Sequence, residues 1–127
     1  MKRPEGANTE TATVLLVDDD EQLRRFCEKS LSRNGFSVLV GDDGLDALVI
    51  AASHGGPIDI LITDIELPRI RGTELGRVFK LLWPHTKVLY LSGSCPASEL
   101  GPDDTLLSKP FPPGAFDRAV GEMLSAR

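Results

Sequence analysis

Side chains that can do chemistry stand directly after several short apolar runs of the sequence. They are Asp18, Asp19 and Asp20 after residues 14–17, Thr63 and Asp64 after 58–62, Ser92 after 88–91, and Ser108 and Lys109 after 106–107. If these runs are parallel strands, their carboxyl ends meet at one edge of a sheet, which is where sites of open α/β sheets form. We therefore expect these groups to share one site, to which the run 36–40, ending in Gly41, adds nothing.

Three of these groups are carboxylates that repel one another when they are brought together. Such repulsion raises the pKa values of Asp18, Asp19 and Asp64 unless a cation lies among them. A site with few ligands, all of them oxygen, suits a hard ion that keeps several waters, which favours Mg²⁺ over zinc or a caged Ca²⁺. The sequence therefore predicts Mg²⁺ as a cofactor, and Lys109 adds a second positive charge.

A cation, a lysine, a hydroxyl and a carboxylate together can accept a phosphoryl group. Mg²⁺ and Lys109 would neutralise phosphoryl oxygens, and Ser92 would donate a hydrogen bond to another of them. A carboxylate would attack phosphorus as the nucleophile. We assign that role to Asp64.

The elements that must position these groups alternate along the chain. The apolar runs are rich in leucine and β-branched residues, as expected of parallel strands covered on both faces. Between them lie a predicted helix over 21–34, with Asp20 as its N-cap and Gly35 as its stop, and three sets of apolar residues at i, i+3, i+4, i+7 spacing. The sets, all expected to face the core, are Leu45, Leu48, Val49 and Ala52; Leu75, Val78, Phe79 and Leu82; and Phe116, Ala119, Val120 and Met123.

Strands that alternate with helices predict right-handed βαβ units in a doubly wound α/β domain with helices on both faces of the sheet. The link 94–104 interrupts the alternation, because Pro96, Gly101 and Pro102 oppose a helix, and a fourth helix there should be short or missing. We expect one domain over 13–127, preceded by a disordered leader over 1–12 that lacks apolar periodicity.

The composition argues against several classes of protein. The chain has 127 residues, enough for one core, and its 14 basic and 19 acidic residues give a formal charge of −5. Because no Lys/Arg run exceeds two residues, we expect no nucleic acid partner. The sequence has no secretion signal, no run of about 18 apolar residues, and cysteines at neither disulfide-framework nor zinc-site spacing, which predicts a cytoplasmic protein without membrane contact.

Four segments, in this order, carry a family resemblance. VLLVDDDEQLRR, ILITDIELPRIRGTEL, VLYLSG and LLSKPF resemble the receiver domain of bacterial two-component response regulators, over roughly residues 13–124. The second and third segments look most like receivers of hybrid sensor histidine kinases. The resemblance implies a flavodoxin-like, five-stranded parallel sheet of order 2-1-3-4-5, with the strand that ends at Gly41 on its edge.

On the matching positions the resemblance implies a separate role for each acid. Asp19 would bind Mg²⁺ directly, Asp18 would bind it through water, and Asp64 would be both a metal ligand and the phosphoacceptor. The main-chain carbonyl of Glu66 would be a further ligand. The bond between Lys109 and Pro110 would be cis, an isomer that only X-Pro bonds adopt readily.

Other positions bear on regulation. By resemblance, Glu66 and Ser94 would flank the leaving path of the phosphoryl group and tune its lifetime, with the carboxylate either repelling hydroxide or orienting water. Leu106 occupies a position where receivers commonly carry an aromatic switch residue. Many receivers dimerise through the helix that the link 94–104 would have to supply, so we expect a monomer or a weak dimer.

The resemblance implies a sensor histidine kinase or a phosphotransfer protein as partner, a downstream protein partner, and no separate substrate turnover, so the chain is not expected to be an enzyme. Two alternatives stay open. Asp18-x-Asp20 after a strand resembles the nucleophile motif of haloacid dehalogenase-like hydrolases, although the Gly-Thr or Gly-Val that should follow is absent. The other alternative is a receiver-like interaction module that is never phosphorylated. Leu106 and the short link keep it open, whereas the intact set of Asp18, Asp19, Asp64, Ser92 and Lys109 argues against it.

Overall fold

The computed structural model describes residues 11–94, 100–102 and 104–125, so residues 1–10 of the predicted leader lie outside it. Strands and helices alternate along the chain up to β4, after which β5 is the next regular element. The elements are β1 (Thr13–Val17), α1 (Glu21–Arg33), β2 (Ser37–Gly41), α2 (Gly44–Ser53), β3 (Ile60–Asp64), α3 (Gly72–Leu82), β4 (Lys87–Ser92), β5 (Thr105–Ser108) and α4 (Ala115–Ser125). The strands predicted from the apolar runs are confirmed with small shifts, the largest of them in β3.

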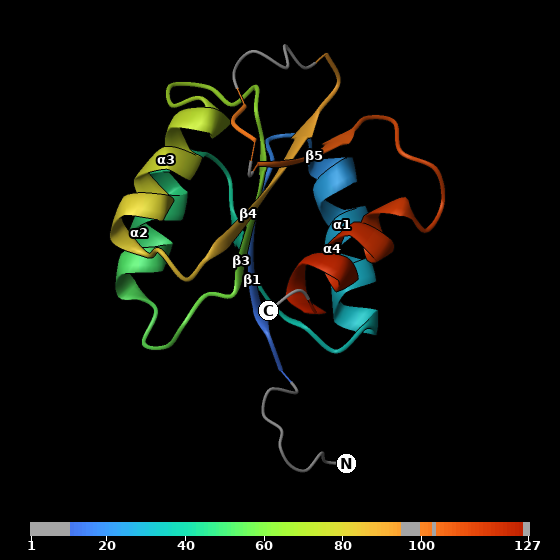
Figure 1. Cartoon of the computed structure of the whole chain (residues 1–127), viewed down its shortest axis with the longest axis horizontal. Coiled ribbons are helices and arrows are strands. Elements are labelled where there is room, and N and C mark those ends of the chain that lie inside the picture. Colours follow the sequence, from blue (N-terminus) through green and yellow to red (C-terminus); the bar gives the residue numbers. More distant parts are fainter. Residues whose placement is uncertain (1–10, 95–99, 103, 126–127) are drawn as a thin grey trace.

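All five strands are parallel and lie in the order β2-β1-β3-β4-β5, the doubly wound, flavodoxin-like arrangement that the resemblance implied. Figure 1 shows α2 and α3 on one face of the sheet and α1 and α4 on the other. Successive strand residues point to opposite faces, so Leu15 and Val17 pack under α2 and α3 while Val14 and Leu16 pack under α1 and α4. The sheet is thus covered by one apolar cluster on each face.

The helix α1 has the ends that the sequence predicted. Asp20 is its N-cap, and the Asp20 side chain accepts hydrogen bonds from the backbone N–H groups of Gln22 and Leu23. Asn34 is the C-cap, and Gly35 follows with a φ of 87°, a conformation that favours glycine. The cap matters for the site, because it fixes the turn in which the acidic run after β1 lies.

The described part of the link between β4 and β5 contains no helix, which agrees with the prediction that a helix there is short or missing. Pro96 and its neighbours up to residue 99 lie outside the described residues. The two strands pair directly, with Leu89 opposite Thr105 and Ser92 opposite Ser108. An ion pair between Lys80 of α3 and Asp104 ties the end of the link to the body of the domain.

The prediction that every apolar residue of the helical sets faces the core was wrong. Leu45 and Val49 of α2 are 52% and 58% exposed, and Leu82 of α3 is 60% exposed. The buried positions of α2 are Ala47 and Ala51, together with its first residue. Helix α2 is apolar on nearly every side, so the spacing of its apolar residues does not decide which face is buried. The face with the small alanines is buried because it allows a closer approach to the sheet.

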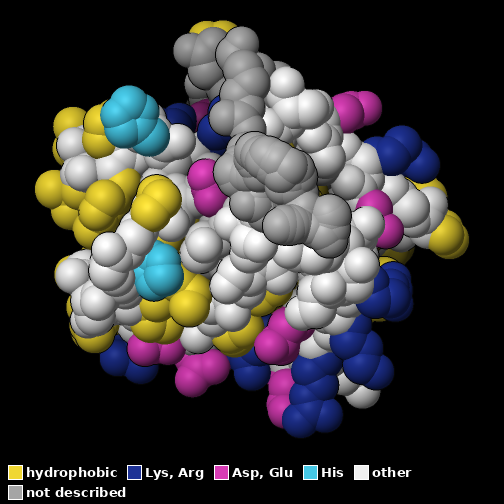
Figure 2. Space-filling model, turned by 90° about the horizontal axis from the view of Figure 1, so that it is seen from below, with side chains coloured by type: hydrophobic (Ala, Val, Ile, Leu, Met, Phe, Trp, Pro, Cys, Tyr) yellow, Lys and Arg dark blue, Asp and Glu magenta, His cyan; other side chains and the backbone are white. Residues whose placement is uncertain are grey.

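The exposed apolar side chains gather on one side of the molecule. Figure 2 shows hydrophobic side chains concentrated on the left, the side on which α2 and α3 lie in Figure 1. Leu81, which is 82% exposed, adds to Leu45, Val49 and Leu82 on these two helices. Within the described residues, none of the helices has the length and apolarity needed to cross a membrane.

Helix α3 approaches β4 closely at a glycine. A Cβ built on Gly76 would lie 1.9 Å from Oη of Tyr90 and 2.8 Å from Cζ of the same ring. Tyr90 is buried in the cluster under α2 and α3, and burial is the main cause that raises its pKa to about 12. The tyrosine therefore fills the space that any side chain at position 76 would need.

Replacing Gly76 by alanine should destabilise the protein, because the new methyl group overlaps Tyr90. We expect the free energy of unfolding to fall by about 1–3 kcal/mol, the usual cost of forcing extra volume into a packed core. Gly121→Ala is the matched control, since Gly121 lies in α4 with nothing within 4 Å of its added Cβ. The control should gain up to about 1 kcal/mol from helix propensity. Urea unfolding measures both, and equal stability of the two variants would contradict the overlap.

Candidate functional site

The carboxyl ends of β1, β3, β4 and β5 bring the predicted site residues together. Asp64 is the last residue of β3 and pairs in register with Leu91, while Ser92 is the last residue of β4. Asp18 follows β1, and Lys109 follows β5. The edge strand β2 contributes no side chain to this group, as its terminal Gly41 predicted.

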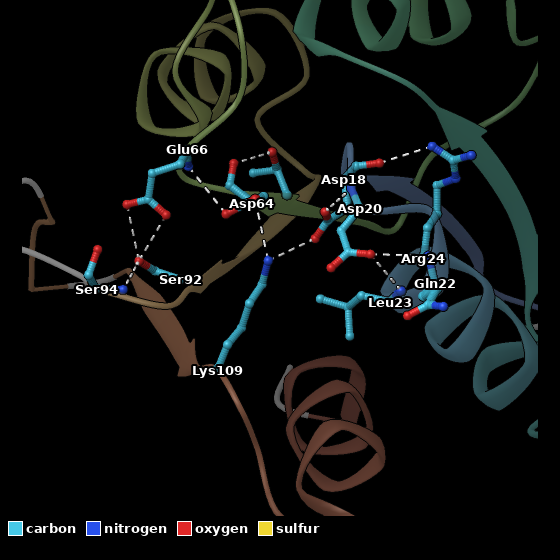
Figure 3. A network of polar contacts seen from close by, with 11 residues as sticks. Asp18, Asp20, Gln22, Leu23, Arg24, Asp64, Glu66, Ser92, Ser94 and Lys109 are labelled. Carbon is cyan, nitrogen blue, oxygen red and sulfur yellow. Dashed lines mark hydrogen bonds and ion pairs between the residues drawn. The ribbon is translucent and has the colours of Figure 1, made fainter.

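Lys109 links the two buried acids of the site. Its Nζ lies 3.1 Å from Oδ2 of Asp18 and 3.3 Å from Oδ2 of Asp64 (Figure 3). Its backbone N–H donates to the carbonyl of Ser92 at 2.7 Å, so the base of the side chain is fixed to β4. The lysine thus reaches from the end of β5, past β4, to the ends of β3 and β1.

Asp18, Asp19 and Asp64 form an acidic cluster. One carboxylate oxygen from each lies within 4.8 Å of the others. Asp18 and Asp64 are buried, whereas Asp19 is exposed, so the cluster opens to solvent on one side. Three carboxylate oxygens with an open side fit a hard divalent cation that keeps several waters, and Mg²⁺ is such a cation.

Asp64 is held at both of its carboxylate oxygens. Its Oδ1 accepts a hydrogen bond from the backbone N–H of Glu66 at 3.2 Å, and its Oδ2 contacts Lys109. The main chain behind it is equally confined, because a Cβ on Gly72 would lie 2.0 Å from the Asp64 carbonyl oxygen. Gly72 is therefore the residue that allows α3 to begin against the end of β3.

Burial and neighbouring charges shift the pKa values of both Asp64 and Lys109. Burial raises the pKa of Asp64 above its ordinary value, and Asp18 adds to the rise, while Lys109 only partly opposes it. Burial alone would lower the pKa of Lys109, but Asp18 and Asp64 outweigh burial and raise it. Burial thus disfavours the charged form of Asp64, whereas the two carboxylates favour the charged form of Lys109.

The hydroxyl of Ser92 lies on the far side of Asp64 from Asp18. Its Oγ is 3.4 Å from each carboxylate oxygen of Glu66, and it accepts a hydrogen bond from the backbone N–H of Ser94 at 3.2 Å (Figure 3). The prediction placed Ser94 and Glu66 beside the acceptor, and the structure brings both to Ser92. The contact of the Glu66 side chain with Ser92 was not predicted.

Arg24 is a site neighbour that the sequence reasoning missed. Its Nη1 donates to the main-chain carbonyl of Asp18 at 3.0 Å (Figure 3). The same Nη1 donates to Oδ1 of Asp42 at 3.1 Å. Arg24 thereby holds the acidic turn to the loop that follows β2. The available signal was its position four residues after the N-cap Asp20, one helical turn into α1.

The remaining predicted positions lie around the site. The peptide bond between Lys109 and Pro110 is cis. Leu106 lies opposite Tyr90 in the register of β4 and β5 and packs against the cluster under α2 and α3, so the aromatic ring at this level of the sheet belongs to β4. Cys27 is buried behind the site, and burial, followed by the charge of Asp18, raises the pKa of its thiol to about 12. Cys27 is therefore part of the apolar core under α1 and α4.

An open groove of about 550 Å³ leads to Lys109. Its lining is mostly apolar, with two charged residues at the site end. The lining residues are Asp20, Leu23, Phe26, Gly93, Lys109, Pro110 and Phe111. Phe26 of α1 is 52% exposed and lies on the wall of this groove.

Comparison with known proteins gives a consistent result. A family model described as response regulator receiver domain matches residues 14–120. The response regulator receiver protein CpdR of Brucella abortus (strain 2308) is 34% identical over 103 residues, which are 77% of this chain and 84% of CpdR. The sensor kinase CckA of the same organism is 33% identical over 119 residues, which are 90% of this chain but only 13% of the kinase. The chain therefore spans a small part of that relative.

Solved structures agree with the sequence relatives. The response regulator receiver protein from Sinorhizobium medicae WSM419 has a TM-score of 0.83 and 32% identity, covering 94% of this chain and 98% of that one. The receiver domain from the hybrid histidine kinase CckA has a TM-score of 0.77 and 29% identity, covering 89% of this chain and 99% of that one.

The raised pKa of Asp64 predicts that Asp64→Asn stabilises the metal-free protein at neutral pH. A carboxyl whose folded pKa lies above its ordinary value of 3.8 costs the folded state stability once it ionises. This cost is absent below pH 3.8 and complete above the folded pKa. An asparagine carries no charge and keeps an oxygen for the Glu66 N–H, so the variant should unfold at a higher temperature than wild type at pH 7.

Thermal unfolding with a chelator, between pH 4 and pH 8, measures this effect. The advantage of Asp64→Asn should shrink as the pH falls toward the ordinary value of Asp64. Glu122→Gln, a charge loss on the exposed face of α4, is the control and should change little at any of these pH values. A variant at position 64 that is less stable than wild type at pH 7 would contradict the assigned strain.

Proposed function

The chain belongs to the response regulator receiver family of two-component signal transduction, and from this premise we propose that Asp64 is the residue on which it accepts a phosphoryl group. The observation that carries the proposal is the position of Lys109 Nζ, within 3.3 Å of both Asp64 and Asp18. An ammonium beside the accepting carboxylate is placed to neutralise oxygens of a phosphoryl group bound there. Asp64 is also held by a hydrogen bond from the backbone N–H of Glu66 in its own loop, which fixes the carboxylate beside the lysine.

In the proposed reaction an oxygen of Asp64 forms the bond to phosphorus while the bond between phosphorus and the donor breaks. The electron pair of that bond leaves with the donor atom, the histidine nitrogen of a kinase or phosphotransfer protein, which then takes a proton. Lys109 stays protonated and stabilises the transferred group. The hydroxyl of Ser92 donates a hydrogen bond to a phosphoryl oxygen.

A divalent cation is part of the proposal. Asp18, Asp19 and Asp64 would hold Mg²⁺, with Asp18 acting through water and the Glu66 carbonyl as a further ligand. When bound, Mg²⁺ supplies positive charge that offsets the carboxylates and the incoming phosphoryl oxygens. The buried position of Asp18 supports this assignment, because an anion there needs a lasting partner.

The partner is proposed from the relatives and from the groove beside Lys109. CckA is a sensor kinase, and its receiver domain is among the similar structures. An open, mostly apolar groove that leads to Lys109 suits a protein donor, whose helix could pack against Phe26 and Leu23 while its histidine approaches Asp64. We propose that the donor is a sensor histidine kinase or a phosphotransfer protein in the cytoplasm. The chain would return the group to water without turning over a separate substrate.

Incubation with acetyl phosphate and Mg²⁺ should add one phosphoryl group to the protein. Intact-mass spectrometry measures the labelling, and Asp64→Asn should abolish it. Lys109→Ala should slow it by about 100-fold or more, since losing one donor to a developing charge commonly costs that much. Glu122→Gln should label as wild type does. Labelling that survives Asp64→Asn would overturn the assignment of the acceptor.

The same preparation tests the alternative of a haloacid dehalogenase-like hydrolase. That alternative requires turnover of phosphomonoesters that depends on Asp18, whereas the receiver is labelled stoichiometrically at Asp64. A receiver-like module that is never phosphorylated would take no label from acetyl phosphate under any condition. These three outcomes are distinct in one set of measurements.

Mg²⁺ should raise the stability of the folded protein, because it binds the acidic cluster only when β1 and β3 place it. At a concentration ten times its dissociation constant, one bound ion adds about 1.4 kcal/mol to the free energy of unfolding. Asp19→Asn should lose most of this gain, and Glu122→Gln should keep it. Thermal unfolding with and without Mg²⁺ is the measurement. A stabilisation that persists in Asp19→Asn would place the ion elsewhere.

A further inference from the structure

The Glu66 carboxylate and the Ser92 hydroxyl face each other across the mouth of the site. Figure 3 shows the Glu66 side chain directed at Ser92, on the side of Asp64 opposite to Asp18. Both carboxylate oxygens lie 3.4 Å from Ser92 Oγ. A hydroxyl between two oxygens of an anion places its hydrogen toward them, because a carboxylate only accepts.

The Ser92 hydroxyl oxygen already accepts a hydrogen bond from the main chain. Its oxygen accepts the backbone N–H of Ser94 at 3.2 Å, which leaves the hydroxyl hydrogen as its one donor. Ser92 is 1% exposed, so exchange of that hydrogen with bulk water is restricted. The hydrogen therefore points either to Glu66 or to a group on Asp64, and not to both.

Glu66 is free to make this contact. The lysine of the site is committed to Asp18 and Asp64, and among the described residues no cation pairs with the Glu66 carboxylate. Its backbone is fixed by the hydrogen bond from its N–H to Asp64, so the side chain starts from a constant position. Charge and geometry thus leave the Ser92 hydroxyl as its partner.

We propose that Glu66 is a positioning residue that holds the Ser92 hydroxyl away from Asp64 in the unphosphorylated protein. This rests on the proposed function, in which a phosphoryl group on Asp64 becomes the competing acceptor. That group carries more negative charge than Glu66, attracts the hydroxyl hydrogen more strongly and repels the Glu66 carboxylate. Distances of 3.4 Å are long for an O–H···O hydrogen bond, so the contact with Glu66 is weak. It favours a hydroxyl orientation toward Glu66 but does not prevent Ser92 from turning to a phosphoryl group on Asp64.

The test is a double-mutant cycle on the initial rate of labelling by acetyl phosphate. Glu66→Ala frees the hydroxyl and also removes a charge that repels the donor. Only the first effect needs Ser92, so the rate gain from Glu66→Ala should be about threefold larger with Ser92 present than in the Ser92→Ala background. Glu66→Gln keeps an oxygen that accepts from Ser92, so its rate gain should show less of this coupling.

A second measurement examines the contact without any phosphorylation. In the metal-free protein, the amide resonance of Ser94 reports the hydrogen bond to Ser92 Oγ and should shift in Glu66→Ala. The shift should be absent when Ser92→Ala is already present. Glu28→Ala, a loss of one carboxylate on α1, is the control and should leave the Ser94 resonance in place.

The outcomes separate this inference from the proposed function. If wild type takes no label, the proposed function fails, whatever the Ser94 resonance does. If wild type is labelled but the rate gain is equal in both backgrounds, the positioning role of Glu66 is overturned. An unchanged Ser94 resonance in Glu66→Ala would overturn it as well.

Discussion

The ammonium of Lys109 between Asp18 and Asp64 is the contact on which the site depends. Two buried carboxylates repel each other when both are ionised, and here the cation that offsets this repulsion comes from the end of β5, two strands away from β3 in the sheet. A long side chain is needed to cross the end of β4, and the hydrogen bond from the Lys109 N–H to the Ser92 carbonyl directs it. The strand order therefore determines which charged side chains meet at the site, as well as which apolar side chains pack together.

Much of the site could be predicted from the sequence because strand ends carry it. Each apolar run marks a strand, and the residue after it must lie at the shared edge, so Asp18, Asp64, Ser92 and Lys109 were found without coordinates. The contact of Glu66 with Ser92 could not be found in this way. It depends on how one loop side chain turns at the mouth of the site, and no pattern of residue types specifies that angle.

For the helices, too, some features could be predicted from the sequence pattern and others could not. The caps of α1 were predictable because Asp20 and Gly35 act locally, through single hydrogen bonds and one backbone conformation. The orientation of α2 was not, because apolar residues surround it, and the choice of Ala47 and Ala51 for the buried face reflects how closely the sheet can be approached. In α2 the small alanines are buried and the larger Leu45 and Val49 are exposed, which is the opposite of what hydrophobicity alone predicts.

The close approach of Gly76 to Tyr90 ties two positions that are far apart in the chain but touch in space. A larger residue at position 76 would require a smaller one at position 90, because the two side chains would occupy the same space. Leu106 lies opposite Tyr90 in the register of β4 and β5, so a change at position 90 would also alter the packing around Leu106.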